Sequence, residues 1–477
     1  MLEILKKYSI TSVSCDSNKV GNGTVFVAIK GQKHNGNDYI DQALAKGASL
    51  VITDDAEIHK KYKDLQPVFH VEQSRKTYAE ICCYLSPEAP ANLLAVTGSS
   101  GKTSTVHYLA QFISSLGTKV ATIGTFGIRI YHQNKIEFLG DTGLNTPDSK
   151  IFNETLSKLK KMGIEYCAME ASSGGLDQYR IYGRKFKACG FTSFSQDHLD
   201  YHGTMENYLN AKLKLFEDYM EDGAYAVINS DMKEIGQISD RINKNRKNYI
   251  TVGSKGDCKI RIVDTTSNYG QRFELDYGGK KYATSTKIIG AFQVWNMVIA
   301  ILMLEKIGFK VEDLISIVPT LKAAEGRLER VDDSDIGSRI FVDYSHKPDA
   351  LEKALIELKS IADKRLILVF GCGGDRDKSK RPIMGAIAAK YADLVIVTDD
   401  NPRYEVPAQI RAEVLAGCLG ATEIGDRREA IAYGINCLKD GDLLLIAGKG
   451  HEDYQIVGDE IFPFCDKKVA LKIINKS

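Results

Sequence analysis

Short apolar runs alternate with helical spacings of apolar residues along most of the chain. Residues 93–96 form one such run and predict a buried strand. After a polar turn at residues 97–103, apolar side chains recur at spacings of three and four from Val106 to Leu116, which predicts a helix that Gly117 ends. A strand, a polar turn and a helix are therefore predicted in direct succession.

The same alternation extends toward both ends of the sequence. It predicts strands over 24–29, 48–53, 166–170, 189–194, 340–344, 366–370, 394–398 and 443–447, and helices over 39–46, 207–220 and 349–359. Strands that alternate with helices are typical of a mostly parallel sheet covered by helices. We therefore predict an α/β protein.

Two points in the sequence favour a division into three domains. Residues 86–90 contain two prolines and make the best linker candidate, and a second doubly wound pattern begins near Gly326. We predict a small N-terminal α/β domain over residues 1–88, a central phosphate-loop, parallel-sheet domain over 89–325, and a C-terminal Rossmann-like domain over 326–477.

The polar turn after the first strand, TGSSGKT, has the composition of a phosphate-binding loop. A glycine loop between a strand and a helix N-terminus directs backbone N–H groups and the helix dipole at one point. Lys102 adds a positive charge there, and the Thr103 hydroxyl can ligate a magnesium ion. A GKT triplet alone is often a surface turn, and this loop is shorter than the usual consensus. The flanking strand and helix favour nucleotide binding.

The overall composition restricts the class of partner. Lys and Arg total 63 and Asp and Glu total 62, so a formal net charge of +1 gives no reason to expect nucleic acid or an anionic membrane. We find no apolar run of about 18 residues and no evident signal peptide. Ten cysteines are scattered without metal-ligand spacing, which favours reduced, mostly buried thiols in a cytoplasmic protein.

Acidic and histidine side chains follow two predicted strands. Glu170 ends the strand over 166–170, and Asp197 and His198 follow the strand over 189–194. Open α/β sheets bind ligands at such strand ends, so these residues and Thr103 are plausible neighbours around magnesium. Magnesium prefers oxygen ligands, which places a histidine at the rim of the site. Taken alone, His198 can be interpreted as a helix-capping or hydrogen-bonded histidine.

Lys212 and Lys214 lie on the predicted helix over 207–220. From spacing alone we interpret them as part of a solvated lysine face.

Three loops in the C-terminal region also follow predicted strands. They span residues 371–377, 399–403 and 448–452, and parallel strands should bring them to one edge of the sheet. Together they carry two arginines, several carboxylates and glycines that allow close backbone approach. This combination suits a ligand with both carboxylate and ammonium groups.

An ordered set of motifs now resembles a known family across nearly the whole chain. The motifs are TGSSGKT, EASSGGL, SQDHLDYHG, NAKLKLF, GAFQVWN, GRLERV, VDYSHKPDAL, GCGGDRDKSKRP, TDDNPR and AGKGHEDYQ. They resemble those of the Mur ligases, and within that family the branch that adds meso-2,6-diaminopimelate. The resemblance implies a three-domain, ATP-dependent amide ligase, with the UDP-sugar, ATP and amino-acid parts on successive domains.

The implied reaction joins meso-2,6-diaminopimelate to the D-glutamyl γ-carboxylate of UDP-N-acetylmuramoyl-L-alanyl-D-glutamate through an acyl phosphate. This is a cytoplasmic step of peptidoglycan synthesis. We expect a monomer that binds these two substrates and ATP, with no nucleic acid or membrane span.

The resemblance also implies which residues bind each ligand. The UDP-muramoyl-dipeptide would contact Ser17, with Gln32 and Lys33 beside it, and Asn145, Thr146, Ser172, Gln178 and Arg180. ATP would contact Gly98, Ser99, Ser100, Gly101, Lys102, Thr103, Asn296 (adenine), Arg327 (phosphates) and Asp343 (ribose). Diaminopimelate would contact Arg376, Asp400, Asn401, Pro402, Arg403, Gly448 and Glu452.

Four residues would carry the chemistry: Lys102, Lys212, His198 and Arg327. Mg²⁺ would be held by Thr103, Glu170, His198 and Lys212. Lys212 would be carbamylated to N6-carboxylysine, which replaces the solvated-face interpretation of that residue.

The sequence departs from the family pattern at five places. Asn145 stands where threonine is more usual, Gly174 replaces a histidine, Gln293 replaces an asparagine, and Ser345 and Lys347 alter the VDY-x-H-x-P-D loop. None of these changes removes a residue that we assign to chemistry.

Three other functions remain open from the sequence. The same ligation with L-lysine is the nearest, and folate polyglutamylation would share the ATP half without the three C-terminal loops. A non-catalytic nucleotide-binding regulator is the alternative from another class, and the complete set of Lys102, Glu170, His198, Lys212 and Arg327 argues against it.

Overall fold

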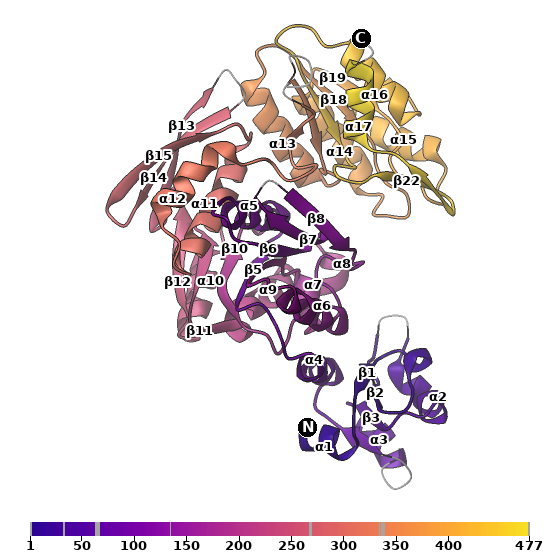
Figure 1. Ribbon diagram of the computed structural model, residues 1–477. Coiled ribbons are helices and arrows are strands. Elements are labelled where there is room, and N and C mark those ends of the chain that lie inside the picture. Colours follow the sequence, from indigo (N-terminus) through magenta and orange to yellow (C-terminus); the bar gives the residue numbers. More distant parts are fainter. Residues whose placement is uncertain are drawn as a thin grey trace. The chain divides into compact units, whose positions relative to one another are not determined.

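The computed structural model describes residues 2–31, 34–62, 67–133, 135–266, 270–332, 334 and 339–475. The chain forms two compact units. The first comprises Met1–Lys259 and Trp295–Leu314, and the second comprises Ile260–Val294 and Ile315–Ser477. Figure 1 labels the elements of both. The two predicted domain boundaries, near residues 88 and 325, stay predictions.

A small parallel sheet in the order β1-β2-β3-β4 lies at the N-terminal end of the first unit (Figure 1). Its strands are β1 (Ser12–Ser14), β2 (Thr24–Val27), β3 (Leu50–Thr53) and β4 (Val68–His70). The helices are α1 (Leu2–Lys7), α2 (Ile40–Ala45), α3 (Ala56–Tyr62) and α4 (Ser74–Leu85), with short 3₁₀ turns at Ser17–Lys19 and Gly36–Tyr39. The predicted elements over 24–29, 39–46 and 48–53 are present and slightly shorter.

A larger sheet occupies the rest of the first unit, in the order β12-β11-β10-β5-β9-β6-β7-β8. It is parallel from β12 to β6, and β7 and β8 add an antiparallel edge. The strands are β5 (Asn92–Thr97), β6 (Val120–Gly124), β7 (Gly127–His132), β8 (Lys135–Gly140), β9 (Tyr166–Glu170), β10 (Phe186–Phe191), β11 (Met220–Asn229) and β12 (Asn248–Gly253).

Helices follow these strands. They are α5 (Lys102–Ser115), α6 (Ser149–Lys161), α7 (Ser173–Asp177), α8 (Leu199–His202), α9 (Met205–Asp218) and α10 (Ile235–Lys244), with α11 (Ala291–Glu305) in the first unit from Trp295 onward. Since β10 and β9 flank β5, the carboxyl ends of these three parallel strands meet at one edge of the sheet.

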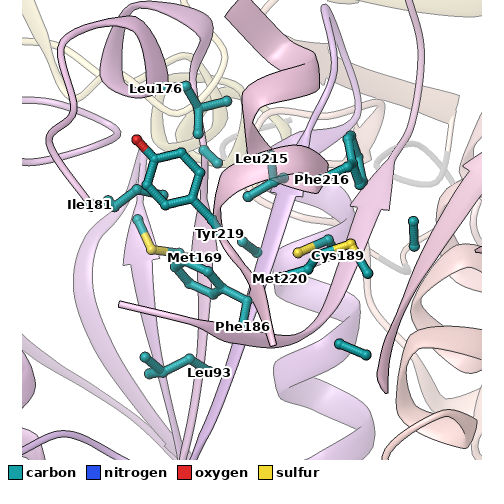
Figure 2. Close-up of a cluster of buried hydrophobic side chains, with 14 of the residues drawn as sticks. Leu93, Met169, Leu176, Ile181, Phe186, Cys189, Leu215, Phe216, Tyr219 and Met220 are labelled. Carbon is teal, nitrogen blue, oxygen red and sulfur yellow. The ribbon is translucent and has the colours of Figure 1, made fainter. Parts of the chain in front are cut away.

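One hydrophobic cluster joins this sheet to the helices that carry candidate site residues. Figure 2 shows Leu176 of α7 and Leu215 of α9 in the same cluster as Met169 of β9 and Phe186 of β10. Full burial of a large apolar side chain contributes about 1.5–3 kcal/mol. The cluster therefore fixes α7 and α9 beside the sheet, and it places the polar residues next to Leu176 and Leu215 at the site.

The second unit contains a six-stranded sheet in the order β16-β17-β21-β18-β19-β20. It is parallel except for β16. The strands are β16 (Glu329–Arg330), β17 (Ile340–Asp343), β18 (Leu366–Phe370), β19 (Leu394–Val397), β20 (Thr422–Glu423) and β21 (Leu443–Ala447). This confirms the predicted doubly wound arrangement, and β18 and β21 have the predicted bounds.

Helices cover this sheet and a hairpin follows it. They are α13 (Pro348–Ile361), α14 (Lys380–Tyr391), α15 (Pro407–Leu415), α16 (Arg427–Asn436) and α17 (Asp466–Ile474), and the hairpin is β22 (Tyr454–Val457) with β23 (Glu460–Pro463). Other elements of the chain are β13 (Cys258–Thr266), β14 (Gly270–Tyr277), β15 (Lys280–Thr286), α12 (Val311–Ile317) and a 3₁₀ turn at Val318–Thr320.

Two elements are displaced from their predicted positions. β10 ends at Phe191 instead of residue 194, because Thr192 and Ser193 turn to hydrogen-bond the phosphate loop. The helix predicted over 207–220 begins at Met205, because the Thr204 hydroxyl accepts a hydrogen bond from the Asn207 N–H and caps it.

None of the helices in the described part of the chain combines the length and apolar character that a bilayer crossing needs. Six of the ten cysteines are buried, as the scattered spacing predicted.

Candidate functional site

The phosphate loop connects β5 to α5, as predicted. Gly101 caps α5 with a φ of 87°, and Gly98 has a φ of 149°. A Cβ at Gly98 would lie 2.0 Å from the Thr192 hydroxyl, and one at Gly101 would lie 2.6 Å from Oδ1 of Asn296. Both positions therefore require glycine, and Asn296 lies directly beside the loop.

Two lysines converge on one backbone oxygen of this loop. Nζ of Lys102 donates to the Gly98 carbonyl at 2.7 Å, and Nζ of Lys212 donates to the same oxygen at 2.9 Å. The Lys212 side chain is 1% exposed, and its Nζ lies 4.4 Å from the centroid of the Tyr208 ring. Spacing alone had indicated a solvated face for Lys212, and that interpretation is wrong because α9 turns this residue into the site.

Lys214, two residues after Lys212 on α9, has different surroundings. Lys214 forms an ion pair with Asp177 at 2.8 Å and keeps a quarter of its side chain exposed.

Thr103 and Glu170 meet where the first turn of α5 faces the end of β9. The Thr103 hydroxyl donates to Oε1 of Glu170 at 3.0 Å, and the Thr125 N–H donates to the same oxygen at 2.8 Å. Glu170 is 1% exposed. A buried carboxylate held beside a hydroxyl at a phosphate loop offers the oxygen ligands that magnesium prefers. The residues present therefore fit a magnesium ion.

His198 lies at the rim of this region. Its side chain is 56% exposed, and Nε2 lies 3.4 Å from Oδ2 of Asp197. Its φ of 52° is left-handed, and its ring contacts that of Tyr208 with centroids 6.2 Å apart. Among the described residues, no three His, Cys, Asp or Glu side chains form a metal-binding group. A metal here would need Thr103 or a modified Lys212 as well.

The candidate muramoyl-peptide residues form a connected polar group. Nη1 of Arg180 donates to the Thr146 carbonyl at 2.8 Å, and the Ser172 N–H donates to the Thr146 hydroxyl at 2.9 Å. Oε1 of Gln178 accepts from Nη2 of Arg180 at 2.8 Å. The structure therefore brings Thr146, Ser172, Gln178 and Arg180 together, and Asn145 precedes Thr146 in the half-buried loop.

A cavity of about 310 Å³ lies against this group. Its lining includes Gln178 and Arg180, together with Cys15, Gly31 and His34 from the segments that connect elements near the N-terminus. Ser17, predicted for the uridine, is buried and donates to Oε1 of Gln42 at 2.9 Å. Gln32 and Lys33 fall outside the described residues.

The cavity lining also contains residues that the sequence did not indicate. Tyr78 donates to Oδ1 of Asp148 at 3.0 Å, and Arg75 lines this cavity and a second one of about 540 Å³. No spacing rule connects residues 70 positions apart. Only the position of Asp148 just after the Asn145-Thr146 pair could have signalled its role.

The three C-terminal loops meet at the carboxyl edge of the six-stranded sheet in the second unit, as predicted. The Gly374 N–H donates to the Asn401 carbonyl at 2.9 Å, and Nη1 of Arg403 donates to the Gly374 carbonyl at 2.8 Å. Nδ2 of Asn401 donates to Oε2 of Glu452 at 2.9 Å. Burial raises the pKa of Glu452, against the opposing charge of Lys449.

Two buried cations that the sequence analysis did not single out hold these loops. Arg381 is 0% exposed and pairs with Glu405 at 2.9 Å and Glu413 at 2.7 Å. Lys449 is also 0% exposed and donates to Oδ1 of Asn401 at 2.9 Å. Arg376, predicted beside Arg403, is exposed. The structure thus places Arg403 and Asn401 within the loop cluster and Arg376 outside its buried part.

Arg327 and Asp343 lie close together in the second unit. Oδ2 of Asp343 accepts from the Leu328 N–H at 2.7 Å, and the Arg327 guanidinium lies 4.6 Å from the Tyr344 ring centroid. Burial raises the pKa of Asp343, although Ser345 and Arg327 oppose it.

The structure shows what surrounds three of the positions that depart from the family pattern, namely Gly174, Gln293 and Lys347. A Cβ at Gly174 would meet no atom within 4 Å, so a larger residue would fit there. Nε2 of Gln293 donates to the Arg327 carbonyl at 3.1 Å. Burial and the Lys347 charge lower the pKa of His346 to about 3, so this ring is neutral.

Three family models match the chain in order. Residues 9–84 match the Mur ligase family, catalytic domain, residues 96–304 match the Mur ligase middle domain, and residues 326–450 match the Mur ligase, glutamate ligase domain. The chain belongs to the Mur ligase family. Its predicted three-domain α/β architecture is the architecture of that family.

Two similar proteins and one solved structure share a name. A UDP-N-acetylmuramoyl-L-alanyl-D-glutamate--2,6-diaminopimelate ligase from Rickettsia prowazekii is 48% identical, over 99% of this chain and 97% of that protein. A ligase of the same name from Caulobacter vibrioides is 40% identical, over 98% and 95%. A solved structure titled as this ligase has a TM-score of 0.70 and 32% identity, covering 98% of this chain and 95% of its own.

Proposed function

We propose that this Mur ligase joins meso-2,6-diaminopimelate to the D-glutamyl γ-carboxylate of UDP-N-acetylmuramoyl-L-alanyl-D-glutamate, with ATP as co-substrate. The observation that carries the proposal is the full-length similarity, at 40–48% identity, to ligases named for this reaction. The phosphate loop with Lys102 and the C-terminal cluster with Arg403 support it, because they supply an anion site and an amino-acid site.

The reaction proceeds in two steps. The γ-carboxylate of the D-glutamyl residue attacks the γ-phosphoryl group of ATP, which gives an acyl phosphate and releases ADP. An amine of diaminopimelate then attacks the acyl carbon, the tetrahedral intermediate expels inorganic phosphate, and the amine proton passes to solvent. Lys102 and Arg327 neutralise charge on the phosphates, so catalysis rests on positioning and electrostatics.

The remaining ATP contacts come from the phosphate loop, α11 and β17. Gly98, Ser99, Ser100 and Gly101 of the phosphate loop contact the phosphates, Asn296 contacts the adenine, and Asp343 contacts the ribose. Thr103, Glu170, His198 and a carbamylated Lys212 would hold magnesium. The ion, when bound, neutralises charge on the phosphates.

The muramoyl-dipeptide and amino acid occupy separate groups of residues. Ser17 contacts the uridine, and Asn145, Thr146, Ser172, Gln178 and Arg180 hold the muramoyl-peptide. Diaminopimelate lies against Asp400, Asn401, Pro402, Arg403, Gly448 and Glu452, with Arg403 at its distal carboxylate and Arg376 as a second contributor. We assign residues 1–88, 89–325 and 326–477 to the UDP, ATP and amino-acid domains, and we propose a cytoplasmic monomer.

Lys212 should be found as a carbamate. The side chain is buried and its Nζ lies at the phosphate loop, where addition of carbon dioxide with loss of a proton would turn the amine into an oxygen ligand for magnesium. Lys212→Ala should lose activity and recover part of it with short carboxylates such as acetate. Lys244→Ala, which changes an exposed lysine of α10, is the matched control. A crystal showing an unmodified Lys212 that points into solvent would contradict this prediction.

A phosphate-release assay tests the function directly. The full chain is supplied with UDP-N-acetylmuramoyl-L-alanyl-D-glutamate, ATP and magnesium, and then with single amino acids. We expect phosphate release with meso-diaminopimelate and little with L-lysine. No release with any amino acid would favour a non-catalytic nucleotide-binding protein, and release with a folate substrate plus L-glutamate would favour folate polyglutamylation.

A further inference from the structure

A chain of hydrogen bonds joins α9 to the candidate muramoyl-peptide residues. It begins at Lys214 of α9, whose Nζ donates to Oδ1 of Asp177 at 2.8 Å. The Tyr201 hydroxyl of α8 donates to the other oxygen of Asp177 at 3.0 Å. Nε2 of Gln178 in turn donates to the Tyr201 hydroxyl at 3.2 Å. Neither Asp177, Tyr201 nor Lys214 has a role in the function proposed above.

The donor and acceptor groups of these residues allow only one direction for this chain of hydrogen bonds. An ionised carboxylate only accepts hydrogen bonds, so Tyr201 must use its single proton on Asp177. The Tyr201 oxygen can then only accept from Gln178, which turns Nε2 of that amide toward Tyr201. Oε1 of Gln178 therefore faces Arg180, and a guanidinium only donates. The orientation of the Gln178 amide that Tyr201 requires is therefore the same as the one that Arg180 requires.

The charge states of the two anchoring groups support this direction. Burial opposes ionisation of Asp177, but the hydrogen bond and charge of Lys214 outweigh it and hold the pKa of Asp177 below its ordinary value. Burial raises the pKa of Tyr201, so its hydroxyl stays protonated at neutral pH.

The far end of the chain fixes the Arg180 guanidinium. Nε and Nη2 donate to Oε1 of Gln178 at 3.2 and 2.8 Å, and Nη1 donates to the Thr146 carbonyl at 2.8 Å. A guanidinium has five N–H groups, so these contacts leave one on each terminal nitrogen for a ligand. Arg180 and Gln178 line the cavity of about 310 Å³, and Gln178, Tyr201 and Asp177 line the one of about 540 Å³.

The helices that carry these hydrogen-bonded residues are held in place by the hydrophobic cluster. Leu176, next to Asp177, and Leu215, next to Lys214, belong to the buried cluster in Figure 2. Loss of one polar hydrogen bond at the surface of this cluster leaves the packing of α7 and α9 in place. A change at Tyr201 should therefore alter the direction of the hydrogen bonds more than the fold.

We propose that Tyr201, anchored by Asp177, is a positioning residue that sets the orientation of the Gln178 amide and Arg180 guanidinium toward the muramoyl-peptide. The inference rests on the function proposed above, and it adds a specificity-determining residue to that site. Tyr201 acts through Gln178 and Arg180. Its loss should weaken binding of the UDP-muramoyl-dipeptide and leave ATP recognition unchanged.

Two variants of the full-length protein test this role. Tyr201→Phe removes the hydroxyl, and Asp177→Asn lets the new amide donate to Tyr201 and so reverse the chain. For each variant, Kd for UDP-N-acetylmuramoyl-L-alanyl-D-glutamate is measured by calorimetry without ATP, and KM for ATP and Tm are measured separately. We expect Kd to rise about tenfold in either variant, as for loss of a hydrogen bond to a charged network, with KM for ATP and Tm unchanged.

Tyr391→Phe is the matched control. It removes a hydroxyl that donates to Glu352 at 2.7 Å in the second unit, and it should leave Kd unchanged. The double variant Tyr201→Phe, Asp177→Asn should bind no more weakly than the weaker single variant, because both changes interrupt one chain.

Three results would overturn the inference. Equal Kd in Tyr201→Phe and the unmutated protein would show that Tyr201 does not position the site. A fall in Tm with parallel losses toward both substrates would show a structural role only. If the unmutated protein itself did not bind the UDP-muramoyl-dipeptide, the proposed function would fail and the inference with it.

Discussion

Replacing Lys102 with alanine should abolish acyl-phosphate formation and leave the fold intact. Nζ of Lys102 lies at the mouth of the phosphate loop, where it donates to the Gly98 carbonyl at 2.7 Å. When a phosphoryl group transfers, negative charge must be balanced there, and preorganised donors of this kind contribute about 10²–10³ in rate. The expected result is a loss of at least this size in kcat, read as phosphate release and as hydroxylamine trapping of the acyl phosphate.

A control separates this effect from a general effect of removing charge. Lys119 is exposed beyond the end of α5, and Lys119→Ala should keep full activity. Circular dichroism and Tm should be unchanged in both variants, because Lys102 packs against its own loop and not in the hydrophobic core. Full activity in Lys102→Ala would contradict the assignment of the phosphate loop.

The parallel sheets were predictable because their strands are apolar on both faces. Residues 366–370 and 443–447 are buried throughout, and the sequence predicted their bounds correctly. β8 differs, because this edge strand keeps Ile136 and Phe138 50% and 61% exposed. An exposed edge strand has no buried face to impose an alternation, so the sequence analysis did not find it.

The candidate site was predictable where its residues follow strands. Loops at the ends of parallel strands must share an edge, which is why the three C-terminal loops were expected together and were found so. The burial of Lys212 and Arg381 depends on which face of a helix meets the sheet. A run of charged residues, such as residues 375–381, indicates a solvated segment. It does not show which of its side chains faces the sheet.

Contacts between distant residues were not predictable. Tyr201 and Asp177 are 24 positions apart, and no periodicity relates them. They meet because α7 follows β9 and α8 follows β10, and the carboxyl ends of these strands share one edge of the larger sheet in the first unit.

The choice between diaminopimelate and lysine should depend on Arg403. Meso-diaminopimelate differs from L-lysine by one carboxylate on the distal carbon, and a planar guanidinium can bind that group through two parallel hydrogen bonds. The structure holds Arg403 firmly. Its N–H donates to the Ile456 carbonyl at 3.1 Å, its carbonyl accepts from the Gly458 N–H at 2.8 Å, and Nη1 contacts Gly374.

The backbone of Arg403 indicates that this position is selected for more than turn formation. Its φ of 51° lies in the left-handed region, which a non-glycine residue occupies at a cost of about 1–3 kcal/mol. A glycine would relieve that cost but supply no cation. Pro402 stiffens the loop just before it, and Glu452 and the Gly448 carbonyl can accept hydrogen bonds from the distal ammonium group.

We therefore expect kcat/KM for meso-diaminopimelate to exceed that for L-lysine by about 10⁴–10⁵, because lysine would leave the guanidinium without its anionic partner. Arg403→Ala should lose most of the activity with diaminopimelate, chiefly through KM, and gain little with lysine. Arg272→Ala, an exposed arginine of β14, is the matched control and should change neither value. Comparable kcat/KM values for the two amino acids in the unmutated enzyme would show that Arg403 does not make the choice.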